Sequence, residues 1–420
     1  MIPESAIART QRCLDGIAAR NAEVNAFLQV LQEGALVQAE ASDHRRKTDR
    51  LIGPLDGVIV ALKDNMDLAG RPTSGGIGHY RASVAQTDAA VVAQLKAAGA
   101  VIIGKTHMQE AALGASGENP WFGRCNNPLR EGYSPGGSSS GSAAAVAAGW
   151  CELAMGSDTM GSVRIPAAYC GMAGFIPSRG SLPLEGVMPL APSLDQVGWI
   201  AASTPLLGSA WQALGGAPPR IGARAGLQGL RIGIATGFPA VPDSGPMQDL
   251  MERARAAAQG AGAALVEVSL STLALTQIRR DAFLLCEIEG AAVHRVGLAA
   301  DPEGFSAGLR KMFAYGARQD AQSALKVRDN LHGAANALRE LMQGTDAWLI
   351  PTTAGAAFAH GTGAPETQAD FTVLANIGGL PAASIPFGTD AAGMPLGLQI
   401  LAPPGADARV LQIAGVLAAR

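Results

Sequence analysis

The sequence predicts an α/β protein in which helices and strands alternate along most of the 420 residues. Short apolar runs bounded by turn residues alternate with longer segments of helical spacing. Hydrophobic residues make up 48% of the chain and charged residues only 16%, so little of the chain should be disordered. Glycine, at 53 residues, is abundant enough to indicate many tight turns.

Apolar periodicity identifies the elements of the first half. Helices are expected where apolar residues recur every three to four positions, and buried strands where short runs are apolar throughout. In order, the patterns predict a helix at 5–41, an exposed charged connector at 43–50, a buried strand at 58–62 that ends in Lys63, a helix at 88–99, a strand at 100–106, a helix at 143–150, a loop at 155–166 and a strand at 196–201.

At about residue 215 the spacing of apolar residues along the chain changes. Most of the segment from there to about 344 has helical spacing, and strand signals return near the C-terminus. Since no internal repeat or low-complexity linker is visible, one compact unit is preferred, although a division near Gly215 stays open. The patterns predict strands at 230–237, 264–270, 347–351, 382–388 and 396–401, and helices at 317–342 and from Ala406 onward.

Composition and charge argue against several classes of protein. The net charge of −3 does not indicate the excess of basic residues that binding to nucleic acid or to an anionic membrane requires. The longest apolar stretch, 143–153, contains Glu152 and is shorter than the roughly 20 residues of a membrane span. Five scattered cysteines without C-x-x-C spacing indicate neither a disulfide framework nor a metal site. With no signal-peptide pattern at the N-terminus, we expect a cytoplasmic protein.

Two short motifs match known patterns in the wrong context. GAVIIGKT at 99–106 has the letters of a phosphate-binding loop, but its middle is an apolar strand that follows a helix. GSSSG at 137–141 matches a nucleophile elbow with Ser139 as the attacking residue, but prolines and charges precede it where a strand is needed. Among the downstream histidines only His360 lies in a loop. Both interpretations are therefore weak.

A second Gly/Ser-rich loop lies at 156–171, GSDTMGSVRIPAAYCG. Together with it, the first loop is better explained as part of a functional site than as a simple turn. Small residues in succession let backbone N–H groups converge on one point, as an oxyanion requires, and Ser162 ends that row. A serine nucleophile needs a base, and the chain has only six histidines. A buried lysine can serve, because desolvation lowers the pKa of an ammonium group. Lys63, at the end of an apolar strand, is the candidate.

Three motifs in this order resemble the amidase signature family, serine hydrolases with a Ser-Ser-Lys triad. They are GVIVALKDNMDLAG at 57–70, PGGSSSGSAAAVAAG at 135–149 and the loop at 156–171. The resemblance covers most of the chain and implies a central mixed β-sheet sandwiched between α-helices. It implies a single amidase domain, 1–420, with the signature core at about 51–210 and 345–420 and a more helical, variable middle region at about 215–344.

The resemblance also implies roles for individual residues. Ser162 would be the nucleophile, Ser138 the bridging serine in a cis peptide with Gly137, and Lys63 the base. Met160 and Ser140 depart from the pattern, since the family most often has glycine at both positions, and Met160 could reshape the acyl pocket. The oxyanion hole falls on the backbone N–H groups of Thr159, Met160, Gly161 and Ser162, and supporting roles fall on Ser139, Ser142, Asp158 and Arg164.

The implied reaction is hydrolysis of a small-molecule amide through an acyl-enzyme, without metal or cofactor, releasing an acid and ammonia or an amine. Trp121 and Phe122, in the loop before the serine-rich stretch, are candidate substrate-lining residues. A homodimer is expected. One alternative is the glutamine-hydrolysing amidase subunit of an aminoacyl-tRNA amidotransferase, ranked second because the chain is short for that role. Another is a catalytically silent binding protein on the same fold.

Overall fold

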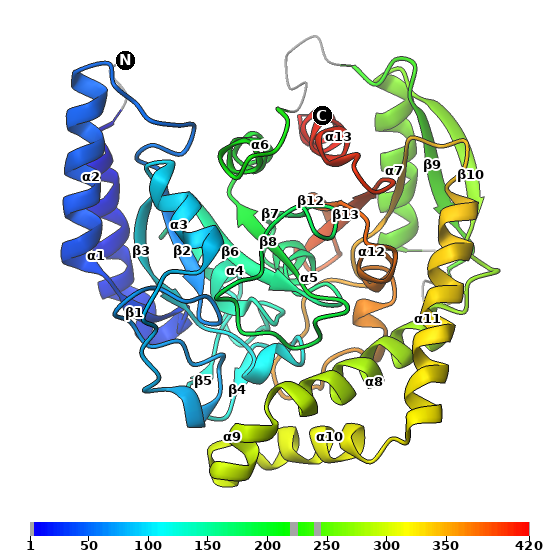
Figure 1. The fold of residues 1–420 in the computed structure, drawn as a ribbon. Helices are drawn as coiled ribbons and strands as arrows, with labels where there is room; N and C mark the ends of the chain where they lie inside the picture. The colour runs from blue at the N-terminus through cyan, green and yellow to red at the C-terminus, as the bar shows by residue number, and fades with distance from the viewer. Residues whose placement is uncertain (1–3, 219–225, 239–244, 420) are drawn as a thin grey trace.

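The computed structural model describes residues 4–218, 226–238 and 245–419. Figure 1 shows the strands running across the molecule, from β3 and β2 on the left to β9 and β10 on the right, with helices around them. The strands are β1 (Phe27–Val30), β2 (Ile59–Lys63), β3 (Val101–Thr106), β4 (Glu118–Asn119), β5 (Gly123–Arg124), β6 (Leu153–Asp158), β7 (Ala173–Ile176), β8 (Gln196–Ala201), β9 (Arg231–Thr236), β10 (Ala264–Ser269), β11 (Ala347–Pro351), β12 (Ala382–Thr389) and β13 (Pro395–Leu401).

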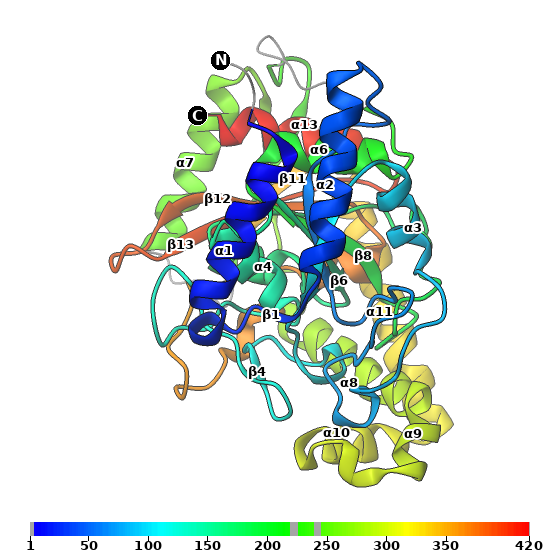
Figure 2. The same cartoon turned by 90° about the vertical axis from the view of Figure 1, so that its left-hand side faces the viewer.

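The helices occupy the segments between these strands. α1 and α2 lie side by side at one end of the molecule, as Figure 2 shows. The α-helices are α1 (Ala6–Val24), α2 (Gln32–Lys47), α3 (Ala90–Ala97), α4 (Ser140–Ala147), α5 (Arg164–Tyr169), α6 (Thr204–Ala213), α7 (Pro246–Gly260), α8 (Leu275–Val293), α9 (Arg295–Ala300), α10 (Ala307–Ala317), α11 (Ala321–Leu341), α12 (Val373–Gly378) and α13 (Asp407–Ala418).

Eleven of the described strands form one mixed sheet, in the order β1-β3-β2-β6-β8-β7-β12-β13-β11-β9-β10. β2 runs parallel to both of its neighbours, β3 and β6, whereas β6 and β8 are antiparallel. β9 and β10, which lie in the middle region of the sequence, extend the same sheet beyond β11. The expected α/β architecture with a central mixed sheet is confirmed.

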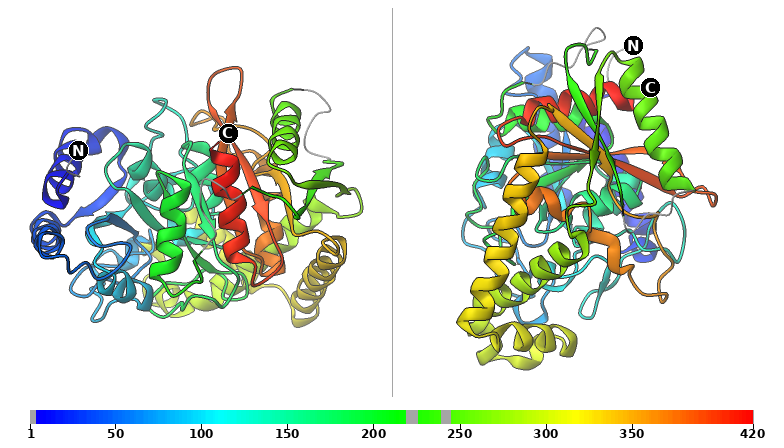
Figure 3. Two further views of the ribbon diagram at one scale, coloured as in Figure 1. Left: turned by 90° about the horizontal axis from the view of Figure 1, so that it is seen from above. Right: turned by 90° about the vertical axis from the view of Figure 1, so that its right-hand side faces the viewer.

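Helices cover both faces of the sheet, and residues of one strand alternate between two hydrophobic cores. In β2, Ile59 and Ala61 belong to one core, and Val60 and Leu62 to the other. The second core includes side chains of α3, α6, α7 and α13, and Figure 3 shows α6 and α13 next to each other above the sheet. The first core includes side chains of α1, α2, α4, α8 and α12. Burial on both sides explains why β2 is apolar throughout.

Three local predictions differ from the structure. The helix expected over 5–41 is interrupted by β1, which pairs with β3. The expected connector at 43–50 begins as the last turns of α2, where buried Asp43 accepts hydrogen bonds from the backbone of Ala6 and Ile7 at 2.7 and 3.0 Å. The loop expected over 155–166 is occupied at its start by β6 and at its end by α5. Strand pairing accounts for β1 and β6, and the hydrogen bonds of Asp43 to α1 help to hold the end of α2; local periodicity cannot register either.

Candidate active site

The side chain of Lys63 enters the protein interior from the end of β2 and contacts two serines. Its Nζ lies 2.7 Å from Oγ of Ser138 and 2.9 Å from Oγ of Ser157. All three side chains are buried, and Lys63 has no exposed surface. The strand delivers the amine to this position because the residues before it are buried on both faces of the sheet. Lys63 and Ser138 are thus brought together as expected.

Burial lowers the pKa of Lys63 to about 7, because the charged ammonium loses its hydration. The carboxylates of Asp158 and Asp195 act in the opposite direction, since negative charge favours the protonated amine. Desolvation is the larger effect. The amine is therefore close to half neutral at neutral pH, and a neutral amine can accept a proton.

The loop that carries Ser138 is tied to the loop that carries Ser162. The peptide bond between Gly137 and Ser138 is cis, as the resemblance implied. The backbone N–H of Ser139 donates to the carbonyl oxygen of Ser162 at 3.2 Å, and its hydroxyl donates to the carbonyl of Ser157 at 3.3 Å. Among the hydrogen bonds of the described residues, none joins the hydroxyls of Ser138 and Ser162. Catalytic hydrogen bonds of this kind often tighten only when substrate is bound.

The turn from Thr159 to Ser162 presents backbone N–H groups, but not all four are available. Oδ1 of Asp158 accepts a hydrogen bond from the N–H of Gly161 at 2.7 Å. Within the described residues, the N–H groups of Thr159, Met160 and Ser162 have no protein acceptor. Gly161 is therefore a correction to the expected oxyanion hole, because its donor is already engaged in holding the turn.

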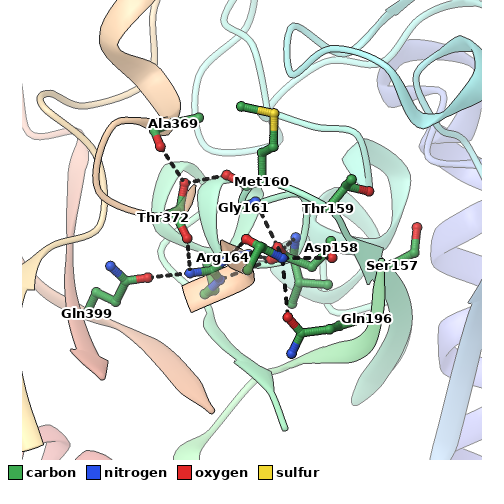
Figure 4. A network of polar contacts seen from close by, with 12 residues as sticks. Ser157, Asp158, Thr159, Met160, Gly161, Arg164, Gln196, Ala369, Thr372 and Gln399 are labelled. Carbon is green, nitrogen blue, oxygen red and sulfur yellow. Dashed lines mark hydrogen bonds and ion pairs between the residues drawn. The ribbon is translucent and has the colours of Figure 1, made fainter. Parts of the chain in front are cut away.

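A buried ion pair holds this turn next to α12 and β13. Arg164 and Asp158 are both fully buried, and Nη2 of Arg164 lies 2.8 Å from Oδ1 of Asp158. Burial by itself raises the pKa of Asp158, but the Arg164 charge and several hydrogen bonds lower it below the usual value. Figure 4 shows the guanidinium at the centre of this network. Arg164 also donates to the carbonyl of Thr372 and to the side chains of Asn376 and Gln399.

The sequence did not single out three polar residues around this centre. Asp195 accepts a hydrogen bond from the Thr159 hydroxyl at 2.6 Å, and burial raises the pKa of Asp195 to about 6. Ser157 contacts Lys63, and Asn65 donates to the Ser157 hydroxyl at 3.0 Å. Asn65 lies two residues after Lys63 in the motif at 57–70, and this proximity could have indicated that Asn65 belongs to the site. Asp195 had none, since it joins the site only through the pairing of β6 with β8.

Ser162 opens into a cavity of about 210 Å³. In Figure 4 the Met160 side chain points away from the Asp158–Arg164 network. Its sulfur lies 3.8 Å from Sγ of Cys286, which is in α8. The cavity is bounded by Ala112, Leu113, Gly114, Ala115, Thr159, Met160, Ser162, Ile165, Leu190, Arg279, Phe283, Cys286, Ala364, Pro365, Glu366, Gln368 and Ala369.

The remaining predicted site residues have other surroundings. Trp121 and Phe122 are not among the lining residues of this cavity; the Trp121 indole donates to Glu110 at 2.7 Å, and the Phe122 carbonyl accepts from Asn25. Their predicted lining role is therefore corrected. The Ser142 hydroxyl donates to the carbonyl of Met155 at 2.9 Å and so fastens α4 to β6.

The two rejected motifs also find structural explanations. The lysine of GAVIIGKT, Lys105, lies in β3 and is fully buried, with its Nζ 3.0 Å from Oδ1 of Asp64. It holds the residue next to Lys63 rather than a phosphate. Ser139 is buried immediately before α4. Across the described ranges, no group of three or more His, Cys, Asp or Glu side chains is arranged to hold a metal ion.

This fold and site resemble a class of known proteins, the amide-cleaving hydrolases. The sequence profile of the family described as Amidase matches residues 8–411. The chain belongs to the amidase signature family. None of its described helices is both long enough and apolar enough to cross a membrane.

Individual relatives cover nearly the whole chain. It is 33% identical to a glutamyl-tRNA(Gln) amidotransferase subunit from Synechococcus sp. (strain RCC307), over 96% of this chain and 92% of that protein. A solved structure of a vestigial protein complex related to the origins of an s-triazine catabolic enzyme matches with a TM-score of 0.90 at 30% identity, over 99% of this chain and 95% of that one. The peptide amidase of Stenotrophomonas maltophilia matches with a TM-score of 0.85 at 27% identity, over 99% and 93%.

Proposed function

We propose that the protein hydrolyses an amide bond through an acyl-enzyme on Ser162, with Ser138 and Lys63 relaying protons. The observation that carries the proposal is the 2.7 Å contact between Nζ of a fully buried Lys63 and Oγ of Ser138. A neutral amine there can take the Ser138 proton while Ser138 takes the proton of Ser162. The Ser162 oxygen then attacks the carbonyl carbon of the amide.

The negative charge that develops on the carbonyl oxygen needs donors that are already in place. The N–H groups of Thr159, Met160 and Ser162 supply them, while the N–H of Gly161 holds the turn through Asp158. Loss of one such donor costs about 2.7–4 kcal/mol in comparable sites. Ser138 then gives a proton to the leaving nitrogen, and the C–N bond breaks. Water attacks the resulting ester, its proton passes back along the same path, and the acid leaves.

Alanine variants of the three residues test this mechanism. Ser162→Ala and Lys63→Ala should each lose at least about a thousandfold in kcat/KM, because the first removes the attacking oxygen and the second removes the base that takes its proton through Ser138. Ser138→Ala should be similarly impaired yet folded, since the side chain is small. A fluorophosphonate probe should label the wild-type protein at Ser162, as mapped by mass spectrometry.

Substitutions of the same residue types elsewhere serve as controls. Ser140→Ala removes a neighbouring buried serine, and Lys96→Ala removes an exposed lysine paired with Asp88. Both should keep most of the activity. Near-normal turnover in Ser162→Ala or Lys63→Ala would refute the proposed roles, and failure of the probe to label folded wild-type protein would revive the catalytically silent binding protein.

The substrate has two candidate classes. The sequence ranked a stand-alone amidase of small molecules first, and the peptide amidase neighbour supports that class. The curated relatives favour the second candidate, a glutamine-hydrolysing subunit. Glutamyl-tRNA(Gln) amidotransferase subunits match at 31–33% identity over more than nine-tenths of their length, in both Synechococcus and Methanothermobacter thermautotrophicus. We infer that ammonia release from a carboxamide is common to both. A cytoplasmic location and a homodimer stay predictions from the sequence.

Glutamine hydrolysis separates the two candidates. The protein is purified alone and together with proteins that co-purify from its own cells, and ammonia release from glutamine is measured in each preparation. Glutaminase activity that rises with a stoichiometric partner supports the amidotransferase role. Turnover of simple aliphatic or aryl amides by the protein alone, without glutaminase activity, supports the stand-alone amidase.

A further inference from the structure

Arg279 places a guanidinium group at the cavity of Ser162, where its charge is paired with that of Asp370. It lies in α8, which forms the wall that also carries Phe283 and Cys286. Among the described lining residues it is the one basic side chain, and Glu366 is the one acidic side chain. The other lining residues are apolar, small or uncharged. Burying a charge among apolar groups is unfavourable, so a cation at this position has to be paired or to bind a ligand.

A buried carboxylate holds one edge of the Arg279 guanidinium. Nε of Arg279 donates to Oδ1 of Asp370 at 2.6 Å, and the exposed fractions of the two side chains are 15% and 0%. Within the described residues, the two Nη nitrogens of Arg279 have no hydrogen-bond acceptor in the protein. The Asp370 contact therefore fixes the orientation of the group and leaves its outer edge to a ligand.

The outer edge of a guanidinium matches a carboxylate. Two parallel N–H donors can bind both oxygens of one carboxylate, which a point charge such as a lysine ammonium cannot do with the same geometry. Glu366 opposes such a ligand only weakly, because it is an exposed residue whose charge is screened by water. The cavity of about 210 Å³ admits only a small ligand.

We propose that Arg279 is a specificity-determining residue that binds a free carboxylate on the amide substrate, with Asp370 as its positioning residue. The inference rests on the proposed amide hydrolysis at Ser162 and narrows its substrate class to small amides of the type carboxylate, short apolar spacer, carboxamide. The apolar lining from Ile165 and Leu190 contacts the spacer. A neutral amide of the same length lacks the group that Arg279 binds.

Protection of Ser162 from a neutral fluorophosphonate probe tests this binding without assuming a natural substrate. Succinamate, glutaramate and adipamate are each compared with the unbranched neutral amide of the same carbon number, as the concentration that halves the labelling rate. In the wild type we expect at least one of the three acids to protect at about tenfold lower concentration than its neutral partner. Arg279→Gln should bring that ratio close to one, and Arg279→Lys should give an intermediate ratio.

Arg280 provides the matched control, since it is the adjacent residue, has the same charge, is exposed and does not line the cavity. Arg280→Gln should keep the wild-type ratio. If Arg279→Gln does not fold because Asp370 is left unpaired, the double variant Arg279→Gln/Asp370→Asn removes the orphan charge and should show the same loss. A ratio near one in the labelled wild type, or a wild-type ratio that survives in folded Arg279→Gln, overturns the inference. Absence of labelling in folded wild type overturns instead the role of Ser162.

Discussion

The protonation of Lys63 depends on a balance between burial and two carboxylates. Burial lowers its pKa to about 7, and the charges of Asp158 and Asp195 raise it from what burial alone would give. Asp158 is already paired with Arg164, which is equally buried. Asp195 has no such cation among the described residues; its oxygens accept from the Thr159 hydroxyl and from the backbone of Leu190 and Ala191. Asp158 has the larger effect on the pKa of Lys63, but Asp195 can be replaced without breaking an ion pair, so Asp195 is the better residue for testing this effect.

The pH dependence of activity follows from this balance. Since Lys63 must be neutral to accept a proton, kcat/KM should rise with pH through about 7 and level off above it. Asp195→Asn removes a negative charge that favours the ammonium form, so the rise should move to lower pH. Stopped-time assays from pH 5 to 9 measure both curves. A shift of the Asp195→Asn curve to higher pH, with the fold intact by circular dichroism, would contradict this assignment.

At the scale of elements, one side chain connects the serine turn to the C-terminal half of the chain. Arg164 begins α5 and bonds residues before and in α12 and in β13, more than 200 positions away in sequence. It thereby fixes the end of β6, where the turn with Ser162 starts, against the opposite part of the sheet. The supporting role that the resemblance implied for Arg164 remains a prediction. The hydrogen bonds of Arg164 to these distant residues are how it would hold the turn in place.

Arg164→Ala should be strongly destabilising, because it leaves the Asp158 carboxylate buried without its partner. Removing one member of a buried pair typically costs about 3–5 kcal/mol. Urea unfolding monitored by circular dichroism measures the change. Arg20→Ala, in an exposed pair with Glu23, is the control and should change stability by less than about 1 kcal/mol. Equal effects of the two substitutions would mean that the network around Arg164 adds nothing to stability.

Two helical glycines should respond to alanine in opposite ways. A Cβ at Gly141 in α4 would collide with the backbone of Ala26 and His107, so Gly141→Ala should destabilise the protein by roughly 2 kcal/mol or more despite better helix propensity. Gly333 in α11 has open space around it, and Gly333→Ala should stabilise by about 0.5–1 kcal/mol. Thermal unfolding of both variants measures the difference. A stabilising Gly141→Ala would show that α4 does not need this close approach.

At the scale of the whole molecule, one sheet contains strands from both sides of Gly215, where the sequence left a division into two domains open. β9 and β10 come from the middle region, yet β9 pairs with β11 near the C-terminus. α8 from the same region supplies a wall of the cavity at Ser162. The one-domain organisation and its boundaries stay a prediction.

Unfolding can test that organisation. If 1–420 is a single cooperative unit, urea unfolding followed by far-ultraviolet circular dichroism and by tryptophan fluorescence should give coincident transitions. Five tryptophans contribute to the fluorescence. Two of them, Trp199 in β8 and Trp348 in β11, lie in different halves of the strand order. Two separated transitions, with the middle region unfolding first, would indicate a division near Gly215.

The amino-acid pattern was enough for the α/β class, for most strands and for Lys63 as a candidate base, whereas the partnership of Lys63 with Ser138 came from the resemblance to the amidase signature family. The apolar run before Lys63 made this residue the candidate for a buried, neutral amine, and the structure shows that its side chain is buried. The Met160 departure was also visible in the sequence.

Tertiary structure alone decided which donors and charges surround the reacting groups. Gly161 is engaged by Asp158, Asp195 reaches the turn through strand pairing, and Arg279 lines the cavity at Ser162 because α8 packs beside α12 and contacts Met160 through Cys286. Trp121 and Phe122, close in sequence to the serine-rich stretch, lie outside the cavity. Apart from the local contact between Gly161 and Asp158, these contacts join separate segments of the chain. They depend on how strands and helices are arranged in the fold, and that arrangement is set by the packing of the whole chain rather than by any one segment.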